Sequence, residues 1–117
     1  MNTEILTANG VDIQKGLELL GDMEMYNDTL RDFLDESATR LPKIQEYAAN
    51  GDMPNYAILV HAMKSDSKYL GFNKLAEMSY QHELESKAGN HTFVNENLAA
   101  LLEEATRIQN VVKTYLG

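Results

Sequence analysis

A histidine, two lysines and a serine recur at helical spacing in the middle of the chain. His61, Lys64, Ser65 and Lys68 stand at positions i, i+3, i+4 and i+7, and residues so spaced lie along one side of a helix. An apolar series turns away from them, made of Tyr56, Leu59, Val60, Met63 and Leu70. The pattern predicts that His61 lies near the edge of the buried face, with a cation one turn along. This arrangement suits a histidine that meets a negatively charged group arriving from solvent.

Aspartates and glycines mark the ends of the helices that precede this stretch. Asp12 is the expected N-cap of a short helix that buries Ile13, Leu17 and Leu20 and ends at Gly21. Asp22 is the expected cap of a long helix that ends at Asn50-Gly51. Its buried face is predicted to contain Tyr26, Leu30, Phe33, Ser37, Leu41, Ile44 and Ala48.

Pro42 lies inside this long helical segment. Proline removes one backbone hydrogen bond and disfavours helical geometry at the residue before it. We therefore expect the helix to kink or to split near Arg40.

Three further helices are predicted, and the first of them carries His61. It opens at Asp52 or Met53, with Pro54 in its first turn, where the missing N–H costs nothing, and ends at Gly71. Asn73 is the expected cap of the next helix, which runs to about residue 88. After a turn at residues 89–91, Thr92 is the expected cap of the last helix. Its apolar series is Val94, Leu98, Leu101, Ala105, Ile108, Val112 and Tyr115.

These patterns predict an all-α fold, an antiparallel four-helix bundle with an additional short N-terminal helix. The last apolar series steps by four and three throughout, as a bundle seam does, and no segment alternates with the period of a strand. Residues 1–10 show no clear period and are expected to form an N-terminal arm or a linker remnant. Residues 11–117 would then be the bundle domain.

Composition narrows the classes of function. The 117 residues suit one domain with a real core, and we expect a monomer. The formal charge of −8 argues against binding to nucleic acid or anionic membranes, because both need a concentrated basic face. The chain has no cysteine, no apolar run near the ~18 residues of a membrane span and no charged start of a signal peptide. We therefore expect a soluble cytoplasmic domain.

The sequence resembles the histidine-containing phosphotransfer (Hpt) domain of phosphorelay signalling over roughly residues 11–116. That family carries a His-x-x-Lys-Gly/Ser signature, a glycine ten residues after the histidine, and a Leu-Glu step in the next helix. Here the corresponding residues are His61, Lys64, Ser65, Gly71 and His82-Glu83. Residues 21–26, Gly-Asp-Met-Glu-Met-Tyr, are also similar to the start of the family's long helix.

The resemblance implies that His61 accepts a phosphoryl group from the aspartyl phosphate of a receiver domain and passes it reversibly to another receiver. Lys64 would stabilise the phosphoryl group, and Glu83 would orient the imidazole through its other nitrogen. Because the residue before this Glu is usually apolar in the family and is His82 here, Gln81 is the alternative orienting residue.

The resemblance also implies the partners of this domain. Ser65, Lys68 and Gly71 would belong to the surface that meets response-regulator receivers, and a sensor histidine kinase would stand upstream. No cofactor is expected in this domain, because Mg²⁺ would be supplied by the receiver. The chain has no nucleotide-binding motif, so we expect a carrier without kinase or ATPase activity of its own.

Other interpretations remain open at the level of sequence. A chemotaxis-type histidine kinase has a phospho-accepting domain with the same bundle and reactive histidine. A non-catalytic helical adaptor would share the fold alone. His82 and His91 lack neighbours at compact ligand spacing, so a metal site is not expected. The sequence also leaves open whether this is a stand-alone protein or a module of a longer hybrid kinase.

Overall fold

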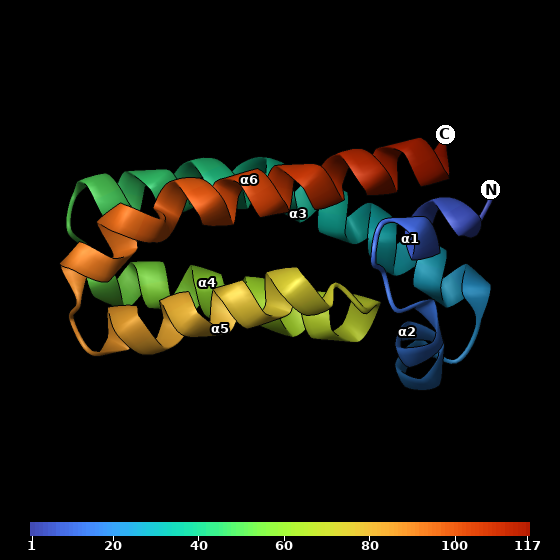
Figure 1. Ribbon diagram of the computed structural model, residues 1–117, viewed down its shortest axis with the longest axis horizontal. Coiled ribbons are helices and arrows are strands. Elements are labelled where there is room, and N and C mark those ends of the chain that lie inside the picture. The colour runs from blue at the N-terminus through green and yellow to red at the C-terminus, as the bar shows by residue number, and fades with distance from the viewer.

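Six helices make up the chain, and no strand is present (Figure 1). The computed structural model describes residues 1–117. The helices are α1 (Glu4–Ala8), α2 (Ile13–Leu20), α3 (Met23–Ala49), α4 (Met53–Leu70), α5 (Asn73–Lys87) and α6 (His91–Leu116). The prediction of an all-α helical bundle is confirmed, with two short N-terminal helices where one was expected.

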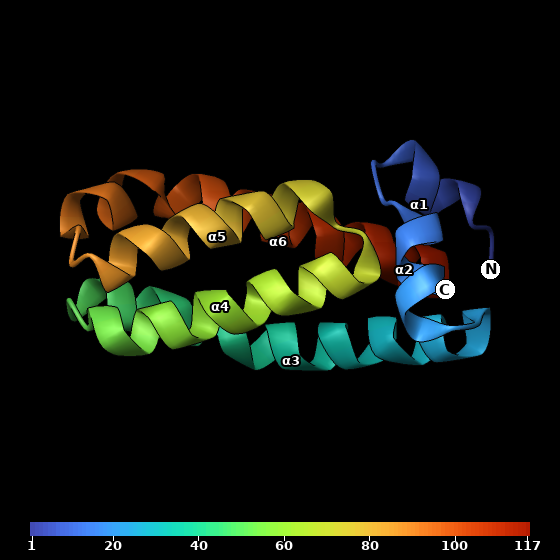
Figure 2. The same cartoon turned by 90° about the horizontal axis from the view of Figure 1, so that it is seen from below.

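The four long helices run antiparallel in two layers. Figure 1 shows α3 and α6 in one layer and α4 and α5 in the other, and α3 packs on both α4 and α6. At 1.5 Å per residue, the 27 residues of α3 suffice to span the 40 Å length of the molecule. Because α4 and α5 are shorter, they leave one end of the bundle open, and α1 and α2 occupy that end (Figure 2).

The core is built from the apolar series that the sequence predicted. Every residue expected on the inner face of α3 is buried. In α4, all of its apolar series is buried except Leu59, which is half-buried, and the same holds for Leu98 in α6. Each such side chain contributes roughly 1.5–3 kcal/mol when it leaves water. In α2, by contrast, Ile13, Leu17 and Leu20 are only half-buried.

Three aspartates cap helices, Asp12 and Asp22 as predicted and Asp52 at the predicted start of α4. The side chains of Asp12, Asp22 and Asp52 each accept a hydrogen bond from the backbone N–H three residues later. Each cap satisfies one backbone donor at the start of its helix. The first residue of each of these helices is therefore set by an aspartate cap in the local sequence.

Two other caps differ from the prediction. Asn73 is the first helical residue of α5, and Phe72 stands in the cap position without a side-chain bond. Asn90, not Thr92, caps α6, because its side-chain oxygen accepts from the N–H of Phe93 at 3.1 Å. The burial of Phe72 in the core fixes the start of α5 without a polar cap.

Pro42 does not split the long helix, and α3 is continuous through it. The proline is exposed, while Leu41 and Ile44 beside it are buried. Burial on the inner side of α3 holds the helix together, so the missing backbone hydrogen bond is tolerated on the outer side.

Residues 1–10, expected to form an N-terminal arm or a linker remnant, contain a short helix. Residues 4–8 form α1, which packs on α6 with Leu6 fully buried. The guanidinium of Arg107 also donates to the carbonyl oxygen of Asn9 at 3.0 Å. Whether these residues continue a linker from a longer chain stays a prediction.

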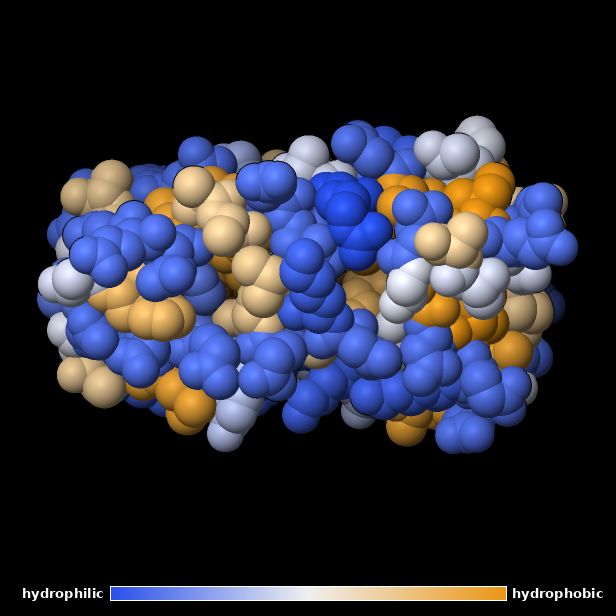
Figure 3. All heavy atoms as spheres, in the orientation of Figure 1, coloured by the Kyte–Doolittle hydropathy of each residue, from blue (hydrophilic) through white to orange (hydrophobic).

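The outer surface of the bundle is mixed. Hydrophilic side chains cover most of the face seen in Figure 3, and its apolar areas are small and separated. None of the helices combines the length and apolar character that a membrane crossing requires.

Candidate functional site

The turn at Gly71 brings α4 and α5 side by side. Gly71 has a φ of +83°, in the left-handed region that glycine adopts without strain. Its carbonyl oxygen accepts from the N–H of Asp12 at 2.9 Å, and a side chain at this position would collide with the carbonyl oxygen of Asp12. Because Gly71 is buried, its expected place on the partner-binding surface is wrong. The residue instead joins α4, α5 and the start of α2.

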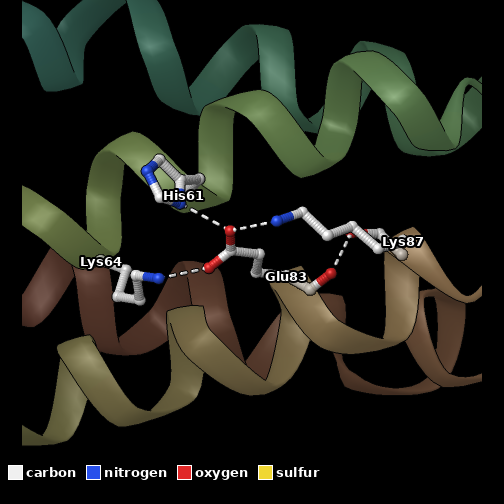
Figure 4. Close-up of polar contacts among 5 residues, drawn as sticks. His61, Lys64, Glu83 and Lys87 are labelled. Atoms are coloured by element: carbon white, nitrogen blue, oxygen red, sulfur yellow. Dashed lines mark hydrogen bonds and ion pairs between the residues drawn. The ribbon is translucent and has the colours of Figure 1, made fainter.

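His61 and Glu83 face each other across α4 and α5 (Figure 4). Nδ1 of His61 lies 2.5 Å from Oε2 of Glu83. The ring is 54% exposed, whereas the Glu83 side chain is 3% exposed. An ionised carboxylate only accepts hydrogen bonds, so Nδ1 is the protonated nitrogen. The other ring nitrogen, Nε2, is therefore unprotonated in the neutral ring and points away from Glu83.

Gln81 does not reach the histidine ring. Its side chain is exposed, and its Nε2 donates to Oε1 of Glu77 at 3.2 Å. Of the two orienting residues that the sequence suggested, only Glu83 contacts His61.

Two lysines complete the contacts of the Glu83 carboxylate. Nζ of Lys64 donates to Oε1 at 2.5 Å, and Nζ of Lys87 donates to Oε2 at 2.8 Å. Lys64 is only 14% exposed, and its ammonium lies 5.2 Å from the centre of the Tyr80 ring. Lys87 was not among the predicted residues, although its i,i+4 spacing from Glu83 is a recognised signal for a helical ion pair.

The charge of Glu83 follows from these contacts. Burial alone would raise the pKa of the carboxyl group, but the hydrogen bonds from Lys64, Lys87 and His61 outweigh it and lower the pKa to about 2. Glu83 is therefore ionised throughout the neutral range. It remains a hydrogen-bond acceptor and fixes the tautomer of His61.

His82, which replaces the usual apolar residue, is a core residue. It is buried, its Nδ1 lies 2.7 Å from the hydroxyl oxygen of Tyr56, and its ring packs edge-on against Phe93. Burial lowers the pKa of His82. The lowered pKa favours the neutral imidazole, which can share a proton with the hydroxyl group of Tyr56. No three side chains of His, Cys, Asp or Glu are placed to hold a metal ion.

Two hollows flank His61. The first has a volume of about 600 Å³ and is lined on the α4 side by Pro54, Ala57 and Ile58, and by Lys87 on α5. The second has a volume of about 520 Å³, and its lining includes Lys15, Lys64, Ser65, Lys68 and Tyr69. Ser65 and Lys68 thus share a surface with His61, as the sequence predicted. The exposed ring stands between an apolar hollow and a basic one.

The family model described as the Hpt domain matches residues 28–111. That span covers most of the chain and contains His61, Lys64, Glu83 and Lys87, whereas α1 and α2 precede it. No curated protein and no solved structure gives a significant match.

Proposed function

This chain belongs to the Hpt domain family, and on that premise we propose that it is a phosphohistidine carrier with His61 as the acceptor. The family's activity is histidine phosphotransfer within a phosphorelay. The donor and the next acceptor would both be aspartates of receiver domains, with a sensor histidine kinase upstream. With such partners the domain would act in the cytoplasm, and we propose that it is a monomer.

One observation carries the assignment, the hydrogen bond between His61 and Glu83. It holds an exposed imidazole by Nδ1 and leaves Nε2 with a free lone pair toward solvent.

The transfer step balances on these atoms. The lone pair of Nε2 attacks the phosphorus of the aspartyl phosphate, an N–P bond forms, and the O–P bond breaks to release the carboxylate. The ring then carries a positive charge that is shared between its two nitrogens. Because Glu83 is ionised and lies 2.5 Å from Nδ1, it stabilises that charge as it develops.

Lys64 and Lys87 both contact the Glu83 carboxylate, whose charge takes part in the transfer step. In the unphosphorylated protein the ammonium of Lys64 is held by Glu83. Stabilisation of the phosphoryl group by Lys64 stays a prediction, and it requires the ammonium to share or leave Oε1 when the phosphoryl group arrives. Phosphoryl transfer depends mainly on such positioning and charge stabilisation, and the receiver would supply Mg²⁺.

The test is labelling of His61→Gln by a receiver domain charged with acetyl phosphate. The native protein should gain a label that is labile in acid and stable in base, as an N–P bond requires. The His61→Gln variant should fold with native helicity and take up no label. His91→Gln is the matched control, because His91 is exposed at the start of α6, and it should label normally. A His61→Gln protein that still accepts the phosphoryl group would overturn the assignment.

A further inference from the structure

Two lysines beside His61 have no carboxylate partner. Lys15 and Lys68 both line the basic hollow that contains His61, and neither forms any of the chain's ion pairs. Both also line an adjoining hollow of about 340 Å³. The one carboxylate there, Glu77, accepts a hydrogen bond from Gln81. In a chain with a net charge of −8, a pair of uncompensated ammonium groups next to the reactive ring is notable because it favours an incoming anion.

The position of Lys15 is fixed by contacts of α2. Asp12 caps this helix by accepting from the N–H of Lys15 at 3.1 Å, and the N–H of Asp12 donates to Gly71 at the end of α4. Gly16, the residue after Lys15, packs so closely on Tyr26 that a side chain at position 16 would overlap the aromatic ring. The start of α2 is therefore held against α4, and Lys15 is presented on the side that carries Lys68.

We propose that Lys15 and Lys68 form a cationic rim that binds acidic side chains around the phosphorylated aspartate of the receiver domain. The inference rests on the proposed function and adds a residue that selects the partner. It makes α2, which lies outside the span matched by the Hpt model, part of the docking surface. Lys15 is then a specificity-determining residue for the partner receiver.

Charge complementarity identifies the occupant of the rim. A receiver that carries an aspartyl phosphate and binds Mg²⁺ must present further carboxylates around that aspartate, because protein-bound Mg²⁺ is held by carboxylates and phosphates. Such a surface is anionic. Lys64 is already held by Glu83, so Lys15 and Lys68 are the ammonium groups of the hollow that have no carboxylate partner. The exposed side chains of Leu19 and Tyr69 in the same hollow add apolar contact area.

The experiment compares the Lys15→Glu variant with Lys43→Glu. Both variants change the net charge equally, but Lys43 is an exposed residue of α3 and does not line the hollows around His61. Receiver domains of the source organism are charged with acetyl phosphate, and the second-order rate of transfer to His61 is measured at low and high salt. We expect Lys15→Glu to slow transfer about tenfold at low salt, with the loss shrinking at high salt. Lys15→Arg should transfer at close to the native rate.

Two further measurements separate the possible failures. Lys68→Glu should give the same salt-dependent loss, which keeps the test decisive if Lys15→Glu folds poorly. Phosphoramidate, a small donor that exchanges its N–P bond for one on imidazole and releases ammonia, labels native His61 without docking. If the native protein labels but Lys15→Glu and Lys43→Glu transfer equally fast from the receivers, the cationic rim is wrong and the carrier function stands. If neither donor labels native His61, the proposed function itself fails, and the rim with it.

Discussion

At the scale of single residues, the site depends on one buried carboxylate with three donors. Glu83 receives hydrogen bonds from His61, Lys64 and Lys87. A buried carboxylate is costly unless its charge is compensated by such partners. The compensation makes Glu83 a permanent acceptor for Nδ1, and the reactivity of Nε2 follows from that. The two lysines therefore act on His61 through Glu83, before any phosphoryl group is present.

Glu83→Gln tests the charge of this carboxylate through the pH dependence of stability. A carboxyl group whose pKa is lowered on folding stabilises the protein above its unfolded value of 4.5, and this stability is lost as pH falls toward the folded value of about 2. The shift corresponds to about 3 kcal/mol. Urea unfolding should therefore show a steep loss for the native protein in this pH range and a shallower one for Glu83→Gln. Equal slopes would contradict a charged, compensated Glu83.

The same variant should also slow phosphotransfer. A glutamine preserves the shape of Glu83, but it cannot offer a negative charge to the imidazole ring, so we expect a loss of roughly 10–100-fold, as for other residues that orient a reactive group. Helicity by circular dichroism is the control for folding, and unchanged transfer kinetics would rule out a contribution from the negative charge of Glu83.

At the scale of the helices, the junction at Gly71 decides how α4 and α5 meet. Gly71→Ala places a Cβ at positive φ and against the carbonyl oxygen of Asp12. Gly89→Ala is the matched control, because Gly89 has a φ of +74° and open space around it. We expect free energies of unfolding lower by about 3 kcal/mol for Gly71→Ala and about 1 kcal/mol for Gly89→Ala. Similar losses in thermal unfolding would show that the contact with Asp12 is unimportant.

The helices that the sequence predicted well are those fixed by local signals. Asp12, Asp22 and Asp52 cap their helices within three residues, and the apolar series of α3 repeats over about six turns. Helix α1 was missed because it has only five residues and is stabilised by distant contacts, through Leu6 and through Arg107 on α6. Local periodicity carries no information about such contacts.

In the candidate site, too, the contacts set by residue spacing were predictable, and the contacts set by tertiary packing were not. The contact of His61 with Glu83 followed from the spacing of the family pattern, since antiparallel neighbours must bring these positions together. The contribution of Lys15 to the hollow depends on how α2 folds back against the end of α4. A tertiary arrangement of this kind leaves no trace in the spacing of residues along α4 and α5.

At the scale of the whole molecule, the helices that span the bundle are different from the helices that carry the reactive residues. The long helices α3 and α6 form one layer and span the molecule (Figures 1 and 2), while α4 and α5 in the other layer carry His61, Glu83, Lys64 and Lys87. The short helices α1 and α2 close the end that this difference in length leaves open. The reactive ring is therefore mounted on a packed scaffold rather than on a loop, which favours a fixed geometry.

A second buried group gives the whole bundle a pH response of its own. His82 on α5 contacts Tyr56 on α4 and Phe93 on α6, and its pKa is lowered by burial. The unfolded chain then binds a proton before the folded one does, so stability should fall as pH drops below about 6.5. His82→Asn keeps an acceptor for Tyr56 without a titratable ring, and chemical denaturation should show no such loss between pH values of about 6.5 and 5. A native-like slope in this variant would assign the effect to another group.

The central claim is that Glu83 holds Nδ1 of His61 and leaves Nε2 to receive the phosphoryl group. The most direct measurement is long-range proton–nitrogen NMR of the protein labelled with ¹⁵N-histidine, before and after transfer from a charged receiver. We predict that phosphorus couples to Nε2 of His61 alone and that the Nδ1 proton remains bound to its nitrogen. A phosphoryl group on Nδ1 of His61, or on His82 or His91, would contradict the account.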